Sequence, residues 1–307
     1  MNWESGYIRG LITAALAEDI GTGDSFVAAT ISAGVHGEAR IEAKQELICA
    51  GLPLAEKVFQ ALDPEMRVEM RRTDGCNVEK GQTVLQLYGV AAAILTGEPT
   101  VLNFLGRMSG IATLTHKFVE KIAGTGVKIR DTQKTTPGLR LLERYAVRVG
   151  GGMNCQFGLF DAILLKEHHI VLAGGVKAAL DQAHSFVSSQ MKPRSMTAYE
   201  AVGTKPSEAE VSSLPIQIEI RTEGELQEAL FAGAEAVLLK NMCPAEARQC
   251  VGIVRNVRPE CIVEISEGIT LANVRAYAET GADYLSCAAL TQAAPNAEFA
   301  LLVDIVQ

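Results

Sequence analysis

A chain of 307 residues is too long to fold around one small hydrophobic core, so two domains, or one barrel with an appended domain, are expected. Hydrophobic residues make up 48% of the chain and aromatic residues only 5%, which is typical of a soluble α/β enzyme. The formal net charge of −8 argues against a general nucleic-acid binder, which needs a basic face, but leaves a local basic pocket for a phosphorylated ligand open.

The cysteines and the apolar runs exclude further classes. The cysteines are odd in number and scattered, and no two form a CxxC pair (Cys49, Cys76, Cys155, Cys243, Cys250, Cys261 and Cys287). This usage predicts reduced thiols, without disulfides or a structural zinc site. The segment after Met1 is polar, unlike a signal peptide, and no apolar run reaches the roughly 18–20 residues that a membrane helix needs. We therefore expect a soluble, cytoplasmic protein.

The first hundred residues combine helical and extended patterns. Apolar residues at helical spacing predict a helix over Tyr7–Glu18, which ends at Gly21. Beyond it we predict three short strands and one helix, namely Ala39–Ala43, Met66–Glu69, Gly81–Tyr88 and Leu52–Leu62. Together these elements predict an α+β domain.

One or two long helices are predicted over Ala91–Ile122, interrupted near Ser109-Gly110, as a bridge to the rest of the chain. After this bridge, apolar strands recur at several spacings of roughly 20–26 residues, which predicts parallel strands and a barrel-like α/β domain. The six strands are Val127–Arg130, Ala162–Leu165, Ile216–Ile220, Ala236–Leu239, Ile262–Ile265 and Tyr284–Leu285. The helical runs among them are Leu139–Val149, Glu223–Ala232, Pro244–Val257 and Thr270–Thr280.

Residues 185–213 break this rhythm. They are polar, carry several serines and prolines, and show no strand pattern. We interpret them as a surface insertion in the barrel.

Barrel enzymes carry their chemistry at the carboxyl ends of their strands. In this chain those positions are Lys134, Lys166, Glu219, Lys240, Ser266 and Ser286. Three lysines at one rim predict a site for phosphate or carboxylate groups, and one lysine among like charges could also act as a nucleophile. Any single one is more simply an exposed lysine at a loop, but three at equivalent strand ends favour the functional interpretation.

Residues 131–170 contain further candidates. The triple glycine Gly150–Gly152 indicates backbone close to a ligand or to a helix, although glycine runs also form plain turns. His168 and His169 could ligate a metal, but adjacent histidines on an extended segment point in opposite directions, so no metal site is predicted. Cys155 has no histidine close by in the sequence to activate it, which favours an inert thiol.

Longer motifs are spread over nearly the whole chain: EDIGTGD at Glu18–Asp24, LNFLGRMSGIAT at Leu102–Thr113, KTTPGLRLLERYAVRVGGG at Lys134–Gly152, GLFDAILLK at Gly158–Lys166, IEI at Ile218–Ile220 and ALT at Ala289–Thr291. Together they closely resemble the quinolinate phosphoribosyltransferase family (nicotinate-nucleotide pyrophosphorylase, carboxylating). The resemblance implies an α/β fold with an N-terminal α+β sandwich over residues 1–112 and an irregular open α/β barrel over residues 113–290. A C-terminal segment, residues 291–307, is expected to return to the N-terminal domain.

The resemblance also implies the activity and the partners. The family joins quinolinate to phosphoribosyl pyrophosphate with Mg²⁺, and releases CO₂, pyrophosphate and nicotinate mononucleotide. Its members form homodimers in which each active site borrows residues from the partner's N-terminal domain. A small anionic substrate is therefore expected, either phosphoribosyl pyrophosphate or a pyridine carboxylate, with neither nucleic acid nor a membrane as a partner.

Carried onto this sequence, the resemblance assigns three groups of site residues. Catalytic positions are expected at Lys134, Lys166, Glu219 and Lys240. Substrate-binding positions are expected at Gln133, Arg140, Asn154, Cys155, Gln156, His168 and His169. Phosphate-binding positions are expected at Ser266, Glu267, Gly268, Ser286 and Gln292.

The sequence departs from the family pattern at these ligand-facing positions. Where the pattern has arginine or histidine for the carboxylates of the acceptor, this chain has Pro99, Gln133, Cys155 and Gln156. An acid of the pattern is replaced by Lys240, and a glycine of the phosphate loop by Glu267. Because losing one buried charged contact costs about 2–5 kcal/mol, losing several predicts an altered acceptor.

Three hypotheses stay open at this point. The first is a phosphoribosyltransferase that accepts quinolinate or a less carboxylated analogue. The second is a repurposed barrel enzyme that does not use phosphoribosyl pyrophosphate, with Schiff-base chemistry at Lys240, although Lys240 could equally form a structural ion pair with Glu219 or Glu267. The third is a non-catalytic binding paralogue with the same dimer.

Overall fold

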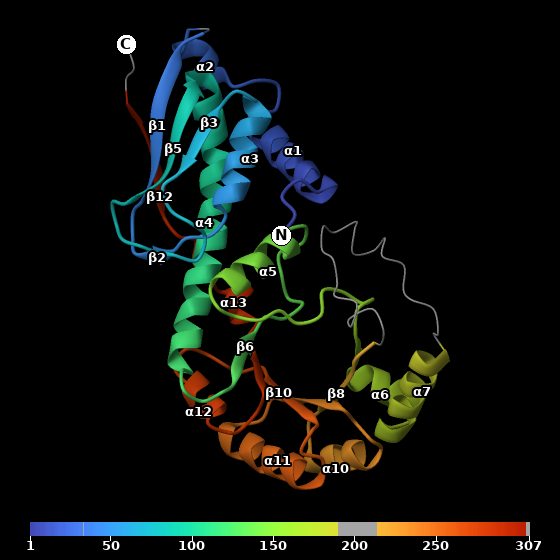
Figure 1. The fold of residues 1–307 in the computed structure, drawn as a ribbon. Coiled ribbons are helices and arrows are strands. Elements are labelled where there is room, and N and C mark those ends of the chain that lie inside the picture. Colours follow the sequence, from blue (N-terminus) through green and yellow to red (C-terminus); the bar gives the residue numbers. More distant parts are fainter. Residues whose placement is uncertain (33, 190–213, 305–307) are drawn as a thin grey trace.

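The structure, a computed structural model, describes residues 1–32, 34–189 and 214–304 and contains two units joined by one long helix (Figure 1). One unit is built on a four-stranded antiparallel sheet and the other on a six-stranded parallel sheet. The predicted fold class, an N-terminal α+β domain followed by an open α/β barrel with parallel strands, is therefore confirmed.

The antiparallel sheet has the order β12-β1-β5-β3, formed by Phe299–Asp304, His36–Ala43, Thr83–Val90 and Arg67–Met70. Every second residue at the end of β1 (Ala39, Ile41 and Ala43) is fully buried, as expected for a strand with one face on a core. Helices α3 (Leu52–Leu62) and α4 (Ala91–Lys121) pack against this sheet, and α1 (Gly6–Ile20) packs on both helices. Short elements complete the unit: α2 (Ser25–Thr30), β2 (Leu47–Ile48) and β4 (Asn77–Val78).

Strand β12 comes from the end of the chain and lies at the edge of the N-terminal sheet. It pairs antiparallel with β1, from Glu38 opposite Asp304 to Ala43 opposite Phe299. The chain thus crosses from the parallel-sheet unit back to the first unit before it ends (Figure 1).

Helix α4 is a single continuous helix, so the interruption predicted near Ser109-Gly110 is wrong. Both residues are small because other segments approach the helix at this point. The Ser109 hydroxyl accepts a hydrogen bond from the Ala50 N–H at 3.0 Å, and a Cβ on Gly110 would overlap the carbonyl oxygen of Pro295. Close packing, and not a break in the helix, explains the glycine.

The parallel sheet has the order β6-β11-β10-β9-β8-β7, formed by Lys128–Arg130, Tyr284–Ser286, Ile262–Ser266, Ala236–Lys240, Ile216–Ile220 and Ile163–Leu165. All neighbouring pairs run parallel, so the carboxyl ends of the six strands meet at one edge. The helices of this unit are α5 (Arg140–Val149), α6 (Glu167–Ala173), α7 (Val176–Ser189), α10 (Glu223–Phe231), α11 (Pro244–Val257), α12 (Val274–Ala278) and α13 (Ala289–Gln292). The sheet curves into an open barrel with helices on its outer side (Figure 1).

The two faces of this sheet differ in polarity. Val237, Leu239, Val263 and Ile265 are fully buried on one face. On the opposite face Glu264 accepts hydrogen bonds from three side chains, at 2.8 Å from Arg130, at 3.1 Å from Gln217, and from the hydroxyl of Ser286. A buried carboxylate with three partners is well compensated, so this network holds the strands in register within the barrel.

The triple glycine lies where the end of α5 packs against α4. A Cβ on Gly150 would overlap the carbonyl oxygen of Ala112, and one on Gly152 would lie 2.8 Å from Thr115 Cγ2. Of the interpretations left open by the sequence, close approach to a helix is the one that the structure supports.

Most of the segment interpreted as a surface insertion, residues 185–213, lies outside the described residues. Residues 185–189 form the end of α7, and the remaining part is not described. Within the described ranges, no helix is both long and apolar enough to cross a membrane.

Candidate functional site

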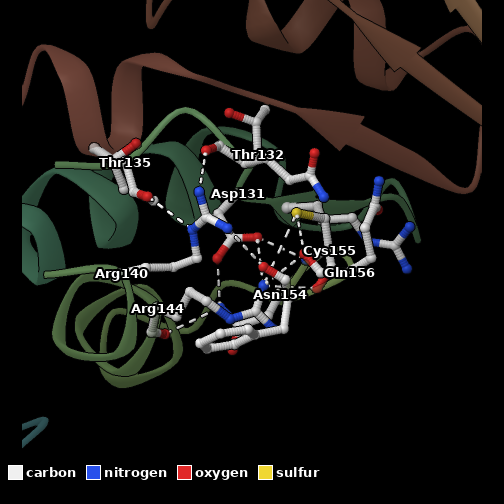
Figure 2. A network of polar contacts seen from close by, with 12 residues as sticks. Asp131, Thr132, Thr135, Arg140, Arg144, Asn154, Cys155 and Gln156 are labelled. Carbon is white, nitrogen blue, oxygen red and sulfur yellow. Dashed lines mark hydrogen bonds and ion pairs between the residues drawn. The ribbon is translucent and has the colours of Figure 1, made fainter. Parts of the chain in front are cut away.

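Asp131, directly after β6, is completely buried and anchors the loop that follows α5 (Figure 2). Its carboxylate accepts hydrogen bonds of 2.6 Å from the Cys155 backbone N–H and from the Asn154 side-chain amide. Burial raises the pKa of Asp131, although Arg144, 3.9 Å away, and the two hydrogen bonds act in the opposite direction. Asn154, a predicted substrate-binding residue, is therefore turned toward Asp131 and holds the loop.

The thiol of Cys155 is not an available nucleophile. Burial first, and then the charge of Asp131, raises the pKa of Cys155 well above its usual range. The thiol therefore stays protonated at neutral pH, and its Sγ lies 3.3 Å from the carbonyl oxygen of Gln156.

The two arginines on one face of α5 bind oxygen atoms of the loops around the site (Figure 2). Arg140 donates at 2.9–3.1 Å to three oxygens, those of Gln133, Thr135 and Phe157. Arg144 donates to two carbonyl oxygens, at 2.7 Å to Cys155 and at 3.2 Å to Gln156. These guanidinium groups fix the protein's own loops, so the predicted substrate-binding role of Arg140 is not the one that its contacts favour.

A cavity of about 570 Å³ lies between these loops, β7 and the helices α6 and α7. Its polar lining comes from Gln133, Gln156, Gln182, Lys166 and His169, and much of its apolar lining from Leu159, Leu165, Leu172 and Phe186. This size is within the range of about 300–1,000 Å³ that is typical of small-molecule sites. Among the described residues of the lining, Lys166 carries the single formal positive charge.

Lys166 and His169 are joined at the start of α6. The Lys166 backbone N–H donates to Nδ1 of His169 at 3.0 Å, which leaves Nε2 to carry the proton of the neutral ring. Burial, followed by the neighbouring His168 and Lys166, lowers the pKa of His169, while Glu219 acts in the opposite direction. His169 is therefore a neutral hydrogen-bond donor at pH 7.

The prediction that His168 and His169 point in opposite directions on an extended segment is wrong. Both lie in the first turn of α6, and their ring centroids are 4.2 Å apart. His168 does not line the cavity. Within the described residues no group of three His, Cys, Asp or Glu side chains could hold a metal ion.

Four charged side chains form a cluster at the carboxyl ends of β8, β9 and β10 and in the loop after β6. The Lys240 ammonium lies 3.5 Å from Glu219 and 3.6 Å from Glu267, and the Lys134 ammonium lies 3.8 Å from the same Glu267 oxygen. The structure thus brings together two of the three predicted lysines with two carboxylates. The third, Lys166, lines the cavity.

The predicted phosphate-binding residues are divided in the structure. Ser266 ends β10 and leads into Glu267 and Gly268, which both have left-handed backbone, with φ of 73° and 70°. Ser286 is buried and donates to Glu264 inside the barrel, so its predicted role at the rim is not supported. Gln292 is exposed at the end of α13.

Sequence reasoning missed two contributors to this site. Arg144 lies one helical turn after Arg140, so its spacing was an available signal that both arginines face the same loops. The apolar wall formed by Leu172 and Phe186 gave no such signal, because α6 and α7 were not predicted as helices.

Comparison with known proteins identifies the family. Residues 24–109 match the family description "Quinolinate phosphoribosyl transferase, N-terminal domain", and residues 111–199 and 197–302 match "Quinolinate phosphoribosyl transferase, C-terminal domain". The chain belongs to the quinolinate phosphoribosyltransferase family. Proteins named probable nicotinate-nucleotide pyrophosphorylase (carboxylating) resemble this family member over most of its length. The one from Bacillus subtilis is 36% identical, and the match covers 97% of this chain and 94% of that protein. The one from Synechocystis is 37% identical, and the match covers 89% of this chain and 85% of that protein.

Solved structures of the quinolinate phosphoribosyltransferase family share the same fold. The nicotinate-nucleotide pyrophosphorylase from Francisella tularensis is 32% identical with a TM-score of 0.84, covering 97% of this chain and 96% of that chain. NadC from Streptococcus pyogenes is 30% identical with a TM-score of 0.85, and the match covers 98% of this chain and 97% of that chain. The relatives are enzymes of the pentosyltransferase kind, which supports enzyme status for this family member.

Proposed function

We propose that this family member is a pentosyltransferase whose acceptor is a ring compound with at most one carboxylate, in place of the dicarboxylate quinolinate. The observation that supports this most directly is the charge of the cavity lining. Lys166 stands beside the neutral amides of Gln133, Gln156 and Gln182 and the neutral His169. Two carboxylates in a half-enclosed cavity need more than one cation, because an unpaired charge loses its hydration without compensation.

The other cations near the cavity already have partners. Arg140 and Arg144 donate to loop oxygens, while Lys134 and Lys240 lie beside Glu267. Moving Arg140 or Arg144 onto a second carboxylate would break these hydrogen bonds. The chain's own contacts therefore favour an acceptor of lower charge.

The remaining lining suits a flat heteroaromatic ring. Lys166 would bind the single carboxylate, and Nε2–H of His169 would donate a second hydrogen bond to it. The side-chain amide of Gln133 donates to the Gly158 carbonyl oxygen at 3.1 Å, which holds its orientation and leaves its oxygen to accept from the ligand. Leu165 and Phe186 would pack on the ring faces.

On the sugar side, Glu219 supplies a buried carboxylate at the carboxyl end of β8. A negative charge at this place would stabilise the positive charge that develops on a ribose when its pyrophosphate leaves. Glu219 and Glu267 share Lys240 as their counter-ion, which does not favour a resident Mg²⁺ at these two carboxylates.

The contacts of Lys240 bear on the Schiff-base hypothesis. Its ammonium group lies within 3.6 Å of both Glu219 and Glu267, which favours the structural ion pair over a free amine. As in the family, we propose a homodimer with shared sites. In this dimer Pro99, inside α4, would bring no charge to the partner's site.

The test is pyrophosphate release from phosphoribosyl pyrophosphate and Mg²⁺ with four candidate acceptors: quinolinate, pyridine-3-carboxylate, pyridine-2-carboxylate and pyridine-3-carboxamide. We expect at least one acceptor with a single carboxylate or none to react about tenfold faster than quinolinate, a difference of about 1.4 kcal/mol in activation free energy. Fastest turnover of quinolinate would overturn the proposal. Absence of release with every acceptor would overturn it in favour of the non-catalytic paralogue.

Lys166→Met should abolish any preference for a carboxylate acceptor over the carboxamide. Lys177→Met is the matched control, because Lys177 is an exposed residue of α7 that pairs with Asp181 and does not line the cavity. The control should leave the preference unchanged.

A further inference from the structure

Glu267 occupies the position of a bridging anion. One of its carboxylate oxygens lies 3.6 Å from the Lys240 ammonium and 3.8 Å from the Lys134 ammonium. Both distances exceed the about 2.7–2.9 Å of a close charge-assisted hydrogen bond. The carboxylate is therefore held loosely between two cations that come from different elements, β9 and the loop after β6.

The backbone at Glu267 has a conformation that favours glycine. Its φ of 73° lies in the left-handed region, where a side chain is disfavoured, and Gly268 follows with φ of 70°. Within the described part of the chain, the backbone N–H groups of Glu267 and Gly268 donate no hydrogen bond. Successive open N–H groups in such a turn form a concave site for an anion.

The cluster is electrically balanced as it stands. Lys134 and Lys240 contribute two positive charges, and Glu219 and Glu267 contribute two negative charges. Glu219 is almost completely buried, but the Glu267 side chain is 33% exposed and can leave the cluster without unfolding the barrel. Without the Glu267 carboxylate, two ammonium groups would share one carboxylate beside a turn that carries two open N–H groups.

We propose that Glu267 is a tethered anion that determines which phosphate-bearing ligands this site accepts. Its carboxylate holds the place between Lys134 and Lys240, so a phosphate or pyrophosphate group binds only when the Glu267 side chain swings away from both lysines. The site therefore discriminates against weakly charged anions and admits those with enough charge to displace an internal carboxylate. This inference rests on the proposed function in taking the donor to be a phosphorylated sugar.

The test is the affinity of the full-length protein for inorganic pyrophosphate, measured by calorimetric titration without any acceptor. Glu267→Gln keeps the size of the side chain and the left-handed backbone but removes the charge. It should bind pyrophosphate about tenfold more tightly than the unchanged protein, because the lysines lose their internal partner. Glu267→Gly should bind at least as tightly and should also melt at a higher temperature, since glycine relieves the left-handed residue.

Glu235→Gln is the matched control, because Glu235 is exposed at the amino end of β9 and changes the net charge by the same amount. Unchanged pyrophosphate affinity in both folded Glu267 variants would overturn the proposal. An equal gain in the Glu235 variant would overturn it too, because the effect would then come from net charge. Since no turnover is measured, a failure here is distinct from a failure of the proposed acceptor.

Discussion

Gln133 and Gln156 bring neutral amides into a cavity whose surrounding loops are held by charged residues. Arg140 and Arg144 donate to the loop oxygens, and Asp131 accepts from the loop that carries Cys155. These contacts hold the loops in place, while the neutral side chains of Gln133 and Gln156 line the cavity. At the residue scale, loop positioning and substrate charge depend on different side chains.

The pKa of His169 can be tested directly by NMR titration of its ring. We predict a midpoint below the ordinary value of about 6.5, because burial, His168 and Lys166 all lower it. In Lys166→Met the midpoint should rise but stay below the ordinary value, since burial is the largest cause. Loss of the assigned signal in His169→Gln secures the assignment, and a wild-type midpoint at or above 6.5 would contradict the neutral donor.

The lowered pKa of His169 predicts the direction in which the free energy of unfolding changes with pH. The folded state binds the proton of His169 less readily than the unfolded chain does. The contribution of His169 to the free energy of unfolding is fully present above about pH 6.5. It is lost as the pH falls through the lower folded-state pKa. Acidification in this window should therefore favour unfolding. In His169→Gln the free energy of unfolding should depend less steeply on pH.

Gln133, Gln156, Lys240 and Glu267 could be selected from the sequence as candidate site residues, because each lies near the end of a predicted strand or beside a motif. Their contacts could not be predicted. Whether Lys240 is a nucleophile or an ion-pair partner depends on distances of 3.5 and 3.6 Å to residues 21 and 27 positions away in the chain. Such distances follow from strand order, which local pattern does not encode.

Helix α4 shows how packing overrides local propensity at the scale of one element. Glycine inside a helix normally indicates weakness, and this predicted a break at Gly110. In the structure α4 runs from Ala91 to Lys121, and the Pro295 carbonyl occupies the space of the missing side chain. The helix can be predicted from the sequence. Pro295, whose carbonyl explains the glycine at position 110, lies about 185 residues further along the chain.

Gly110→Ala separates these two explanations. If the glycine merely weakened the helix, alanine would stabilise the protein by about 1 kcal/mol. Because a Cβ would overlap the Pro295 carbonyl oxygen, we predict destabilisation by about 1–3 kcal/mol in urea unfolding.

Gly252→Ala is the control for this prediction. Gly252 lies within α11, and a Cβ there would meet nothing within 4 Å. This variant should be as stable as the unchanged protein or more stable, by up to about 1 kcal/mol. Equal stabilisation by both alanines would contradict the packing account of α4.

At the scale of the whole molecule, six parallel strands bring residues from distant parts of the chain to one edge. Their apolar runs and regular spacing allowed the strands and the barrel-like unit to be predicted closely. The helices α6 and α7 were not predicted. Neither were the cavity and the pairing of β12 with β1, because these two depend on contacts between segments far apart in sequence. The family resemblance added the expected return of residues 291–307 to the N-terminal domain, and the family matches confirm membership of the family.

The most direct test of the central claim is the relative affinity for quinolinate and pyridine-3-carboxylate, measured by calorimetry on the unchanged protein and on the double variant Gln133→Arg, Gln156→Arg. We predict that the unchanged protein binds the monocarboxylate at least as tightly as quinolinate. The two added cations should shift the preference about tenfold or more toward quinolinate. Binding of quinolinate by the unchanged protein about tenfold more tightly than the monocarboxylate would contradict the account.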